Sequence, residues 1–414
     1  MSDAAQHYFV QSIAGFTDAR AAAEAELGNR GVQQPLPQRA EWQRAQGAAD
    51  TVLFVARTVE GDPVRSVSAS IGTSRALPGH HVYRVERIGG SESPQADEAA
   101  LTALADLVRR DRRCLRLVVE IFERDRLVRA RLTNALRRLG FARSSTVRMY
   151  RRTLGIALRR PSTKVLATLH KAARRDIRGS SKRGLEVRAI TDPALAPRLD
   201  ELTPPAFRRT PMIDRRRPWA RIIALSAANP SVSRLAGLFD PQIDGPDALL
   251  AFAWGCRHGS YVSYEDGGPR RVEPGDAPLR YASLWDLIVW ANEETNAEWF
   301  DLGGITDGVA ESSPSDDSDF KRHFSREVFD VGEEWLIEPY KVRATIARRV
   351  SGAARWLDDT WRHASDRARE ASDAADSALP EQSDWSIYRV RGHTFVLPRG
   401  AVRDSVRDLG ERRP

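Results

Sequence analysis

Cysteine is scarce in this sequence of 414 residues, and histidine is thinly spread. The two cysteines, Cys114 and Cys256, each lie in an apolar run, which predicts buried free thiols and no disulfide framework. The eight histidines are scattered, and neither a C-x-x-C nor an H-E-x-x-H pattern occurs. The sequence therefore predicts no metal site.

Long hydrophobic runs are missing as well. No uninterrupted apolar stretch approaches the roughly 18 residues that span a bilayer. The N-terminus has no basic region followed by an apolar core, which is the pattern of a signal peptide. These absences predict a cytoplasmic protein without a transmembrane segment.

Positive charge is in excess, and arginine supplies most of it. The chain has 64 Lys and Arg against 56 Asp and Glu, a formal net charge of +8. A guanidinium group binds phosphate through two parallel hydrogen bonds, so the excess suits phosphate-bearing partners. An arginine-rich proteome explains the same excess equally well, so charge alone does not name the partner.

Strand and helix patterns alternate along the chain in two similar series, which predicts an α/β fold with a duplicated domain. A first domain is expected over residues 1–152, a second over 153–341, and a helical tail with a terminal hairpin over 342–414. In the first domain the predicted strands are 52–56, 64–71, 81–88, 115–122 and 147–150, with helices at 99–110 and 127–139. In the second they are 185–190, 248–254, 259–264 and 298–302, with helices at 194–207 and 284–291.

A basic helix is predicted within the stretch from Lys164 to Arg188. Its apolar residues recur at helical spacing; Ser162 can cap its start, and Gly179 or Gly184 can end it. Four cations, three or four residues apart, form a ridge along one side: Lys171, Arg174, Arg178 and Lys182. This basic ridge can hold an anion, and it can equally be a solvated surface face.

A second stretch, Pro278–Phe324, completes a longer pattern. It contains Tyr281, then the run F-D-L-G-G-I at 300–305, then F-K-x-x-F at 320–324. With the run L-H-K-x-x-R-x-x-I-R that begins at Leu169, these motifs resemble the signatures of the Fem family of aminoacyl-tRNA-dependent transferases, which add amino acids to peptidoglycan precursors. The chain departs from the family in having Ser325 where a glycine is frequent, and it has no long helical arm.

The resemblance implies two tandem GNAT-like (acyl-CoA N-acyltransferase-like) domains, with mixed sheets flanked by helices. The implied activity is an aminoacyltransferase that takes an amino acid from aminoacyl-tRNA, without a further cofactor, to an amine of a peptidoglycan or other cell-envelope precursor. If that precursor is lipid-linked, the basic ridge predicts peripheral membrane contact.

The resemblance also implies site residues. As catalytic groups we expect Lys321, which would stabilise the negative charge of a tetrahedral intermediate, and Asp301, which would orient the glycine loop or the attacking amine. The alternative for Lys321 is a surface lysine paired with Asp317 or Asp319. The expected substrate-binding residues are Lys171, Arg174, Arg178, Lys182, Tyr281, Gly303, Gly304, Phe320 and Phe324.

Two other functions stay open at this point. Residues Arg152–Ala157 fit R-x-x-G-x-A, the pyrophosphate loop of acetyl-CoA-dependent enzymes, and so keep a CoA-dependent N-acyltransferase of GNAT fold as an alternative. The same segment reads better as a strand. The third function is a non-catalytic RNA- or lipid-binding relative, which predicts steeply salt-dependent binding without turnover.

Overall fold

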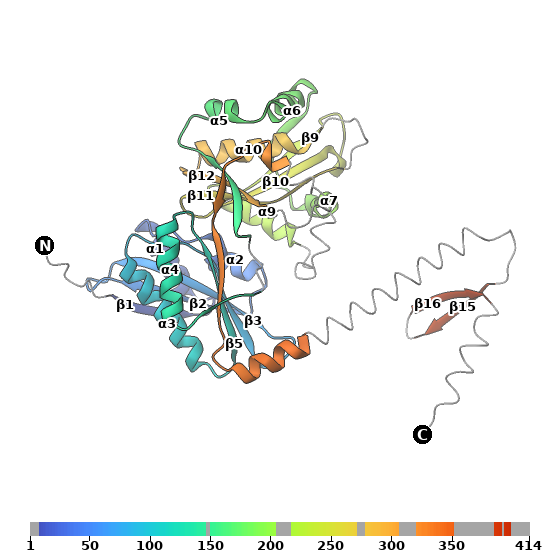
Figure 1. Ribbon diagram of the computed structural model, residues 1–414. Helices are drawn as coiled ribbons and strands as arrows, with labels where there is room; N and C mark the ends of the chain where they lie inside the picture. Colours follow the sequence, from blue (N-terminus) through green and yellow to red (C-terminus); the bar gives the residue numbers. More distant parts are fainter. Residues whose placement is uncertain are drawn as a thin grey trace. The chain divides into compact units, whose positions relative to one another are not determined.

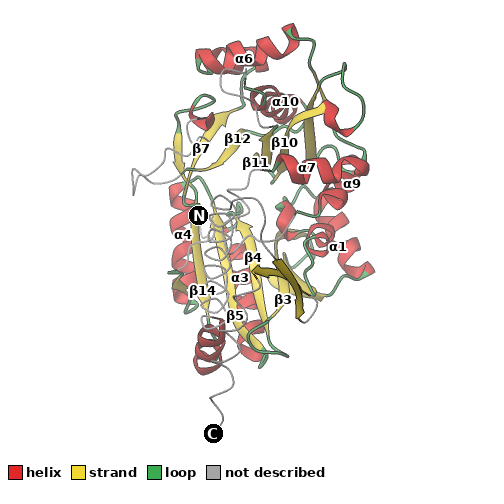
Figure 2. Cartoon of the chain, turned by 90° about the vertical axis from the view of Figure 1, so that its right-hand side faces the viewer, coloured by secondary structure: helices red, strands yellow, loops and turns green. Residues whose placement is uncertain are grey.

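The structure is a computed structural model that describes residues 8–145, 150–203, 217–270, 278–305 and 320–351, and the backbone of two strands at 385–390 and 393–398. Residues 1–348 form one compact unit and residues 349–414 a second. The first unit contains two mixed sheets flanked by helices (Figure 1, Figure 2). The predicted α/β class is therefore confirmed.

The first sheet has seven strands in the order β1-β2-β3-β4-β5-β14-β6. Their bounds are Phe9–Ala14 (β1), Asp50–Arg57 (β2), Pro63–Thr73 (β3), His81–Ile88 (β4), Cys114–Phe122 (β5), Gly332–Ile337 (β14) and Ala142–Arg143 (β6). β4 and β5 are parallel, and the other neighbouring pairs are antiparallel. Helix α3 (Pro94–Arg110) connects β4 to β5, since parallel strands need a long crossover.

Helices cover both faces of this sheet. α3 and α4 (Arg126–Arg138) bury Leu104 and Leu136 in a cluster that includes Phe54, whereas α1 (Asp18–Asn29) buries Leu27 in another cluster with Leu53. Successive residues of a strand point to opposite faces, so adjacent Leu53 and Phe54 enter different clusters. The short helices η1 (Leu36–Gln38) and α2 (Ala40–Ala45) follow α1.

The second sheet repeats this plan in the order β13-β7-β12-β11-β10-β9-β8. Its strands are Val328–Asp330 (β13), Arg152–Ala157 (β7), Trp299–Gly304 (β12), Tyr261–Pro269 (β11), Leu249–Arg257 (β10), Ser233–Phe239 (β9) and Glu186–Ala189 (β8). β11 and β12 are parallel and are connected through α10 (Arg280–Glu293), as β4 and β5 are through α3. The repeated order of strands and helices confirms the predicted duplication.

Two groups of helices pack on the second sheet. One hydrophobic cluster joins α5 (Ser162–Thr168), α6 (Lys171–Lys182) and α10 to the strands. Another contains residues of α7 (Ala196–Leu202) and α9 (Trp219–Ala228), with η2 (Pro193–Leu195) and η3 (Pro246–Ala248) beside them. Trp42 of α2 joins this second cluster and lies 5.4 Å, ring centre to ring centre, from Trp254 of β10. The two halves of the unit therefore share buried side chains.

One segment contributes strands to both sheets. After Phe324 the chain adds β13 to the edge of the second sheet and then β14 to the first, between β5 and β6. The range 153–341, expected as the second domain, thus contains one strand of the first sheet. The range 1–152 ends at the first residue of β7.

Several predicted elements change their bounds in the structure. The helix predicted at 284–291 is longer, so that Tyr281 lies inside α10 and not before it. The helix predicted at 194–207 ends at Leu202, and part of it, like most of the strand predicted at 147–150, lies outside the described residues. Both cysteines are buried free thiols, as predicted.

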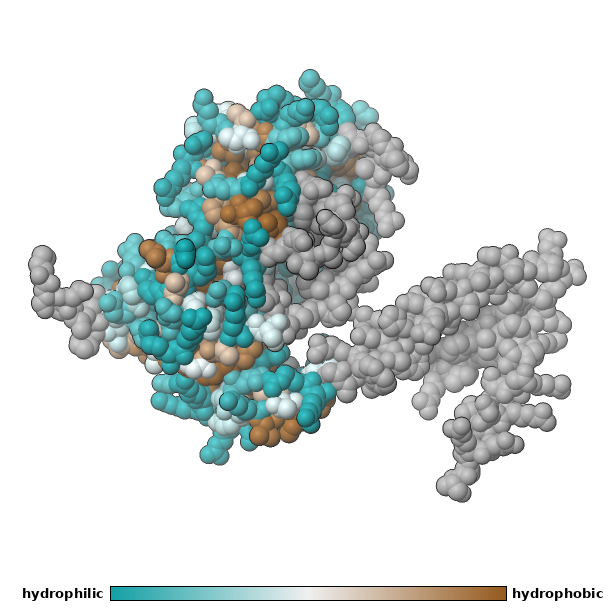
Figure 3. Space-filling view, in the orientation of Figure 1, coloured by the Kyte–Doolittle hydropathy of each residue, from teal (hydrophilic) through white to brown (hydrophobic). Residues whose placement is uncertain are grey.

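The tail is described only in part. A helix covers residues 341–351, and its side chains Val342, Ile346 and Val350 are exposed. Figure 3 shows hydrophobic surface at the position of this helix on an otherwise mostly hydrophilic face. The predicted terminal hairpin is confirmed, since β15 (Trp385–Val390) pairs antiparallel with β16 (His393–Pro398).

Candidate functional site

The parallel strands β11 and β12 separate at the centre of the second sheet. They pair only from Tyr261 to Ser263 with Trp299 to Asp301, and the register of β12 against β7 is irregular between Asp301 and Gly304. Gly303 has a φ of +84°, a left-handed conformation that glycine adopts without strain. The glycines of the F-D-L-G-G-I run therefore let β12 turn away from β11 and open the sheet.

Lys321 occupies this opening. The residue is only 7% exposed, and its Nζ donates a hydrogen bond to the Gly304 carbonyl at 3.3 Å. A Cβ atom on Gly303 would lie 3.5 Å from that Nζ. Lys321 is therefore not a surface lysine, while Asp317 and Asp319, its predicted alternative partners, lie outside the described residues.

Asp301 is completely buried beside the same turn. Its carboxylate accepts hydrogen bonds from Tyr150 Oη at 2.6 Å, from the Gly303 amide at 2.9 Å and from Thr153 Oγ1. Burial and the negative charge of Asp301 raise the pKa of the Tyr150 hydroxyl well above its usual value. Asp301 thus holds the glycine turn to β7, and its oxygen atoms are already occupied.

Arg87, near the end of β4, is a residue of the first half that contacts this site in the second half. Its guanidinium donates to Glu265 Oε1 at 3.1 Å, and one of its nitrogen atoms lies 3.7 Å from Asp301 Oδ2. It also lies within 3.4 Å of the hydroxyls of Tyr150 and Tyr261. Sequence reasoning missed Arg87, because nothing local distinguishes it from the chain's many other arginines.

A Ser-His-Glu cluster lies behind Arg87, but its hydrogen bonds do not form a nucleophile. Ser263 Oγ donates to Glu265, and His258 Nε2 lies 2.7 Å from the same Oγ. Burial and the charge of Arg87 lower the pKa of His258 to about 4, so the ring is neutral. Because Ser263 Oγ donates its proton to Glu265, the contact of this Oγ with Nε2 requires the tautomer with the proton on Nε2. The serine proton therefore points to a carboxylate and not to a base.

The predicted aromatic residues form the support of Lys321. Tyr281, Phe320 and Phe324 are each less than a tenth exposed, and their rings pack together with centroid distances of 5.0 to 5.7 Å. Tyr281 Oη and His323 Nδ1 share a hydrogen bond of 2.6 Å. These residues anchor the 320–324 turn in the core, which fixes Lys321 where β11 and β12 separate.

The predicted single basic helix is wrong, because the chain breaks at Leu169 and His170 into α5 and α6. Both residues are extended, and His170 Nδ1 accepts the Ala172 amide as the N-cap of α6. The ring of His170 also stacks on His323 at 4.9 Å. α6 runs through Gly179 to Lys182 and is followed by Gly184 at a φ of +74°.

The basic ridge does form on α6. Lys171, Arg178 and Lys182 are exposed and make no hydrogen bond or ion pair with other described residues, whereas Arg174 donates to the Ala167 carbonyl at 2.8 Å. The buried face of α6 carries Ala173 instead, which packs in the core cluster with Tyr281. The ridge therefore points away from the core.

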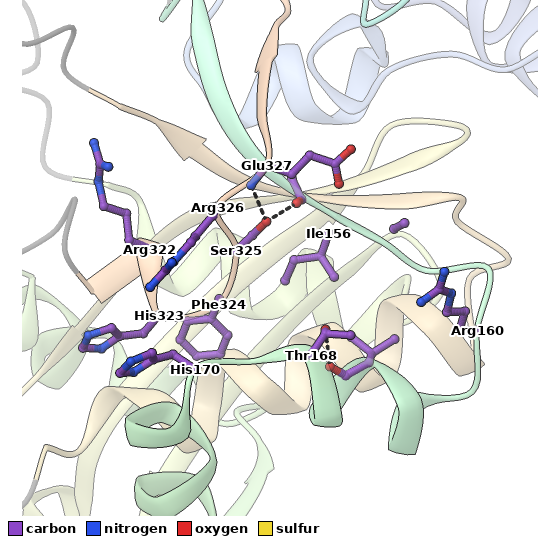
Figure 4. Close-up of a pocket in the computed structure, with 13 residues that line it drawn as sticks. Ile156, Arg160, Thr168, His170, Arg322, His323, Phe324, Ser325, Arg326 and Glu327 are labelled. Atoms are coloured by element: carbon purple, nitrogen blue, oxygen red, sulfur yellow. Dashed lines mark hydrogen bonds between the residues drawn. The ribbon is translucent and has the colours of Figure 1, made fainter.

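A cavity of about 520 Å³ adjoins the turn that carries Lys321. Figure 4 shows it between β7, α5 and the segment 322–327, with the stacked rings of His170 and His323 at one side. Arg160, Arg322 and Arg326 also line it, and all three are exposed. The guanidinium groups of these three arginines make no hydrogen bond or ion pair with another residue in the part of the chain that the structure describes.

Residues Arg152–Ala157, which fit the pyrophosphate-loop pattern, form strand β7, and the sequence favoured a strand over a loop at this position. The connection from β4 to α3 in the first half does lead from a strand through Gly89-Gly90 to the start of a helix. Two of its backbone amides, however, already donate hydrogen bonds to side chains of the protein. The Gly90 amide donates to Glu123 at 3.1 Å, and the Ser91 amide donates to Asp97 at 3.1 Å. Two carboxylates of the protein thus occupy the place where a phosphate would bind.

No protein-family model and no curated protein sequence matches the chain. Among solved structures, FemX has a TM-score of 0.64 and 14% identity, over 81% of this chain and 100% of FemX. L-PGS from Bacillus licheniformis has a TM-score of 0.49 and 9% identity, over 82% of this chain and 97% of L-PGS. A tandem GNAT protein from the clavulanic acid biosynthesis pathway has a TM-score of 0.45 and 13% identity, over 80% of this chain and 99% of that protein. The TM-score with FemX confirms the resemblance to the Fem family at the level of the fold. The two similarly ordered mixed sheets fit the expected pair of tandem GNAT-like domains. Among the described helices, none has the length and apolar character needed to cross a bilayer.

Proposed function

We propose that this protein is an aminoacyltransferase that moves an amino acid from aminoacyl-tRNA to an amine of a peptidoglycan or other cell-envelope precursor. The observation that carries the proposal is the buried Lys321 at the opening between β11 and β12, within a two-sheet fold similar to that of FemX. Charged tRNA is a cytoplasmic donor, so the reaction is proposed to take place in the cytoplasm. Contact with a lipid-linked acceptor would be peripheral.

The reaction converts an ester into an amide. The acceptor amine attacks the carbonyl carbon of the aminoacyl ester, the C–N bond forms, and the C–O bond to the ribose breaks while a proton passes from the amine to the ribose oxygen. Negative charge develops on the carbonyl oxygen in between. A fixed donor aimed at that oxygen lowers the activation free energy by about 3 kcal/mol. The buried Lys321 ammonium supplies such a donor at the opening of the sheet.

Asp301 supports this chemistry as a positioning residue. Its hydrogen bonds to Tyr150, Thr153 and the Gly303 amide hold the turn whose next carbonyl, that of Gly304, contacts Lys321. Loss of the Asp301 carboxylate would release this turn. We therefore expect Asp301→Asn to lower both stability and kcat, whereas Lys321→Met lowers kcat and leaves the fold intact.

The choice of donor rests on a separate observation. A CoA-dependent enzyme needs free backbone amides at a strand-to-helix connection for the pyrophosphate. In the first half Glu123 and Asp97 occupy those amides, and the R-x-x-G-x-A segment is a strand. These contacts argue against an acetyl-CoA site in the first half, while the corresponding connection of the second half, residues 271–277, lies outside the described residues.

The test is a transfer assay with the purified chain, with labelled mixed aminoacyl-tRNA or labelled acetyl-CoA as donor and a panel of amine acceptors. We expect label to pass from tRNA, and Lys321→Met to slow the transfer by about 100-fold or more. Lys341→Met is the matched control, because Lys341 is exposed and outside the site. Transfer from acetyl-CoA alone would replace the proposal by the CoA-dependent alternative. Binding of RNA without transfer from either donor would favour the non-catalytic relative.

A further inference from the structure

We propose that the second half docks on an anionic membrane surface through the groove between α6, β8 and α10, with a phospholipid acyl chain in the groove and lipid phosphates on the basic ridge. The groove has a volume of about 230 Å³, and neither Asp301 nor Lys321 lines it. Figure 2 shows α6 on the outer side of α10. The sequence linked the ridge to a membrane only through a lipid-linked acceptor, whereas the groove gives a reason that does not depend on the acceptor or on the proposed reaction.

The lining of the groove is mostly apolar. Six of its nine residues have apolar side chains: Ile177, Leu185, Val187, Ala282, Trp285 and Val289. Among the polar ones, Ser180 Oγ donates to the Asp176 carbonyl at 3.1 Å, and Asp286 forms an ion pair with Arg234 at 2.9 Å. A hydrocarbon chain needs no hydrogen bonds and therefore suits this groove, whereas a nucleobase would leave its polar edge unpaired there.

The apolar side chains of the groove are open to solvent. All of them except Ala282 are only partly buried, and Trp285 is the largest. Apolar surface that a hydrocarbon chain covers is removed from water, which favours binding. Tryptophan is also enriched at membrane interfaces, because its ring is apolar and its N–H is polar.

Positive charge dominates α6. The helix contains five cations and one acid, Asp176, which is buried and pairs with Arg175 at 2.9 Å. Lys171, Arg178 and Lys182 make no hydrogen bond or ion pair with other described residues, and they span about 16 Å along the helix. An anionic membrane presents phosphates side by side, so a row of cations of this length can contact several of them at once.

The cations stand at the edge of the groove. Arg178 directly follows Ile177 and lies three residues before Ser181, and both of these line the groove. Lys182 directly follows Ser181. Residues three or four apart are neighbours on the surface of a helix, so the ridge and the groove share one edge. Their long apolar stems can lie along the acyl chain while the charged ends reach the phosphates, as in helices that lie in a membrane interface.

The first test is sedimentation of the full chain with vesicles of phosphatidylcholine, with and without phosphatidylglycerol, in the absence of any donor or acceptor. We expect binding to the vesicles that contain phosphatidylglycerol and a loss of binding as the salt concentration rises. Arg178→Gln and Lys182→Gln are each expected to weaken this binding about fivefold. Arg110→Gln and Lys341→Gln are the matched controls, since both residues are exposed cations outside α6, and they should leave the binding unchanged.

The second test addresses the groove with phospholipids that carry bromine on the acyl chain. Bromine quenches tryptophan fluorescence only near contact, so the bound wild type should lose part of its emission and bound Trp285→Phe should lose much less. Leu185→Gln places a polar group in the groove and is expected to weaken vesicle binding about tenfold. Thermal unfolding of both variants checks that the fold is kept.

The proposal is overturned if the vesicles do not bind, if Arg178→Gln and Lys182→Gln bind them as the wild type does, or if the brominated lipids quench the wild type and Trp285→Phe equally. Binding of single-stranded RNA that depends on the ridge, without binding of vesicles, would overturn it in favour of an RNA surface. A dimer that Leu185→Gln dissociates, again without vesicle binding, would assign the groove to a second copy of the chain. No substrate is present in these tests, so their failure leaves the transferase proposal standing, and a failed transfer assay leaves this one standing.

Discussion

Arg87 contacts residues of both halves, so its loss should lower the stability of the interface between them. We consider Arg87→Met, which keeps a long apolar side chain and removes the charge. The guanidinium contacts Glu265 and Asp301, and its central carbon lies 4.6 Å from the centre of the Phe122 ring. The variant therefore leaves two carboxylates without their cation, one of them fully buried and the other mostly buried.

The size of the effect follows from the burial of the partners. Asp301 is 0% exposed, the Glu265 side chain 19% and the Arg87 side chain 12%. Burial alone would raise the pKa of Glu265, but the attraction of Arg87 and the hydrogen bonds from His258 and Ser263 hold it well below its usual value. Removal of one partner of such a buried pair costs about 3–5 kcal/mol, a large share of the roughly 5–15 kcal/mol of a typical domain.

The assay is urea unfolding of the wild type, Arg87→Met, Glu265→Gln and the double variant. Because Glu265→Gln removes the unpaired charge, the double variant should be at least about 1 kcal/mol more stable than the sum of the single losses predicts. Arg138→Met is the control, since Arg138 and Glu98 form an exposed pair worth about 1 kcal/mol or less. Single losses that add within about 0.5 kcal/mol, or a loss for Arg87→Met no larger than that of the control, would refute the reasoning.

Three further measurements address single residues. Burial and Arg87 lower the pKa of His258 to about 4, so on acidification the unfolded chain takes up a proton at a higher pH than the folded protein does. The free energy of unfolding should therefore fall by about 2 kcal/mol between pH 7 and pH 5. His258→Gln should remove most of this loss when unfolding by urea is measured at the two pH values. Burial and Glu86 raise the pKa of Glu120 to about 7, so its contribution is present below about pH 4.5 and lost as the pH rises through 7, and Glu120→Gln should remove that slope. Gly179 lies inside α6 with open space where a Cβ would stand, so Gly179→Ala should raise stability by about 0.5–1 kcal/mol in thermal unfolding.

Most of the fold follows from local pattern. The apolar run of β5 and the amphipathic helices α3 and α4 are visible in the sequence, because a strand or helix with one buried face repeats its apolar residues at a fixed period. The order of these elements then fixes the α/β class. The crossing of β14 into the first sheet is not visible, because its strand pattern does not say which sheet it joins.

The site was predictable only where a motif marked it. The F-D-L-G-G-I and F-K-x-x-F runs led to Lys321 and Asp301, although their roles stay predictions. The break before α6 was missed because His170 has little intrinsic preference for a cap, and His323, on which its ring stacks, lies far along the chain. Arg87 was missed for the same reason, since its partner Glu265 is 178 residues away in the sequence.

The segment that bears Lys321 is held by both sheets. Ser325 Oγ donates to the Gly155 carbonyl at 2.6 Å on β7, and three residues later β13 pairs with the same strand. The chain then enters the first sheet as β14, where Glu334 lies opposite Glu120 of β5. Hydrogen bonds therefore connect the lysine turn to the second sheet through β13 and to the first sheet through β14.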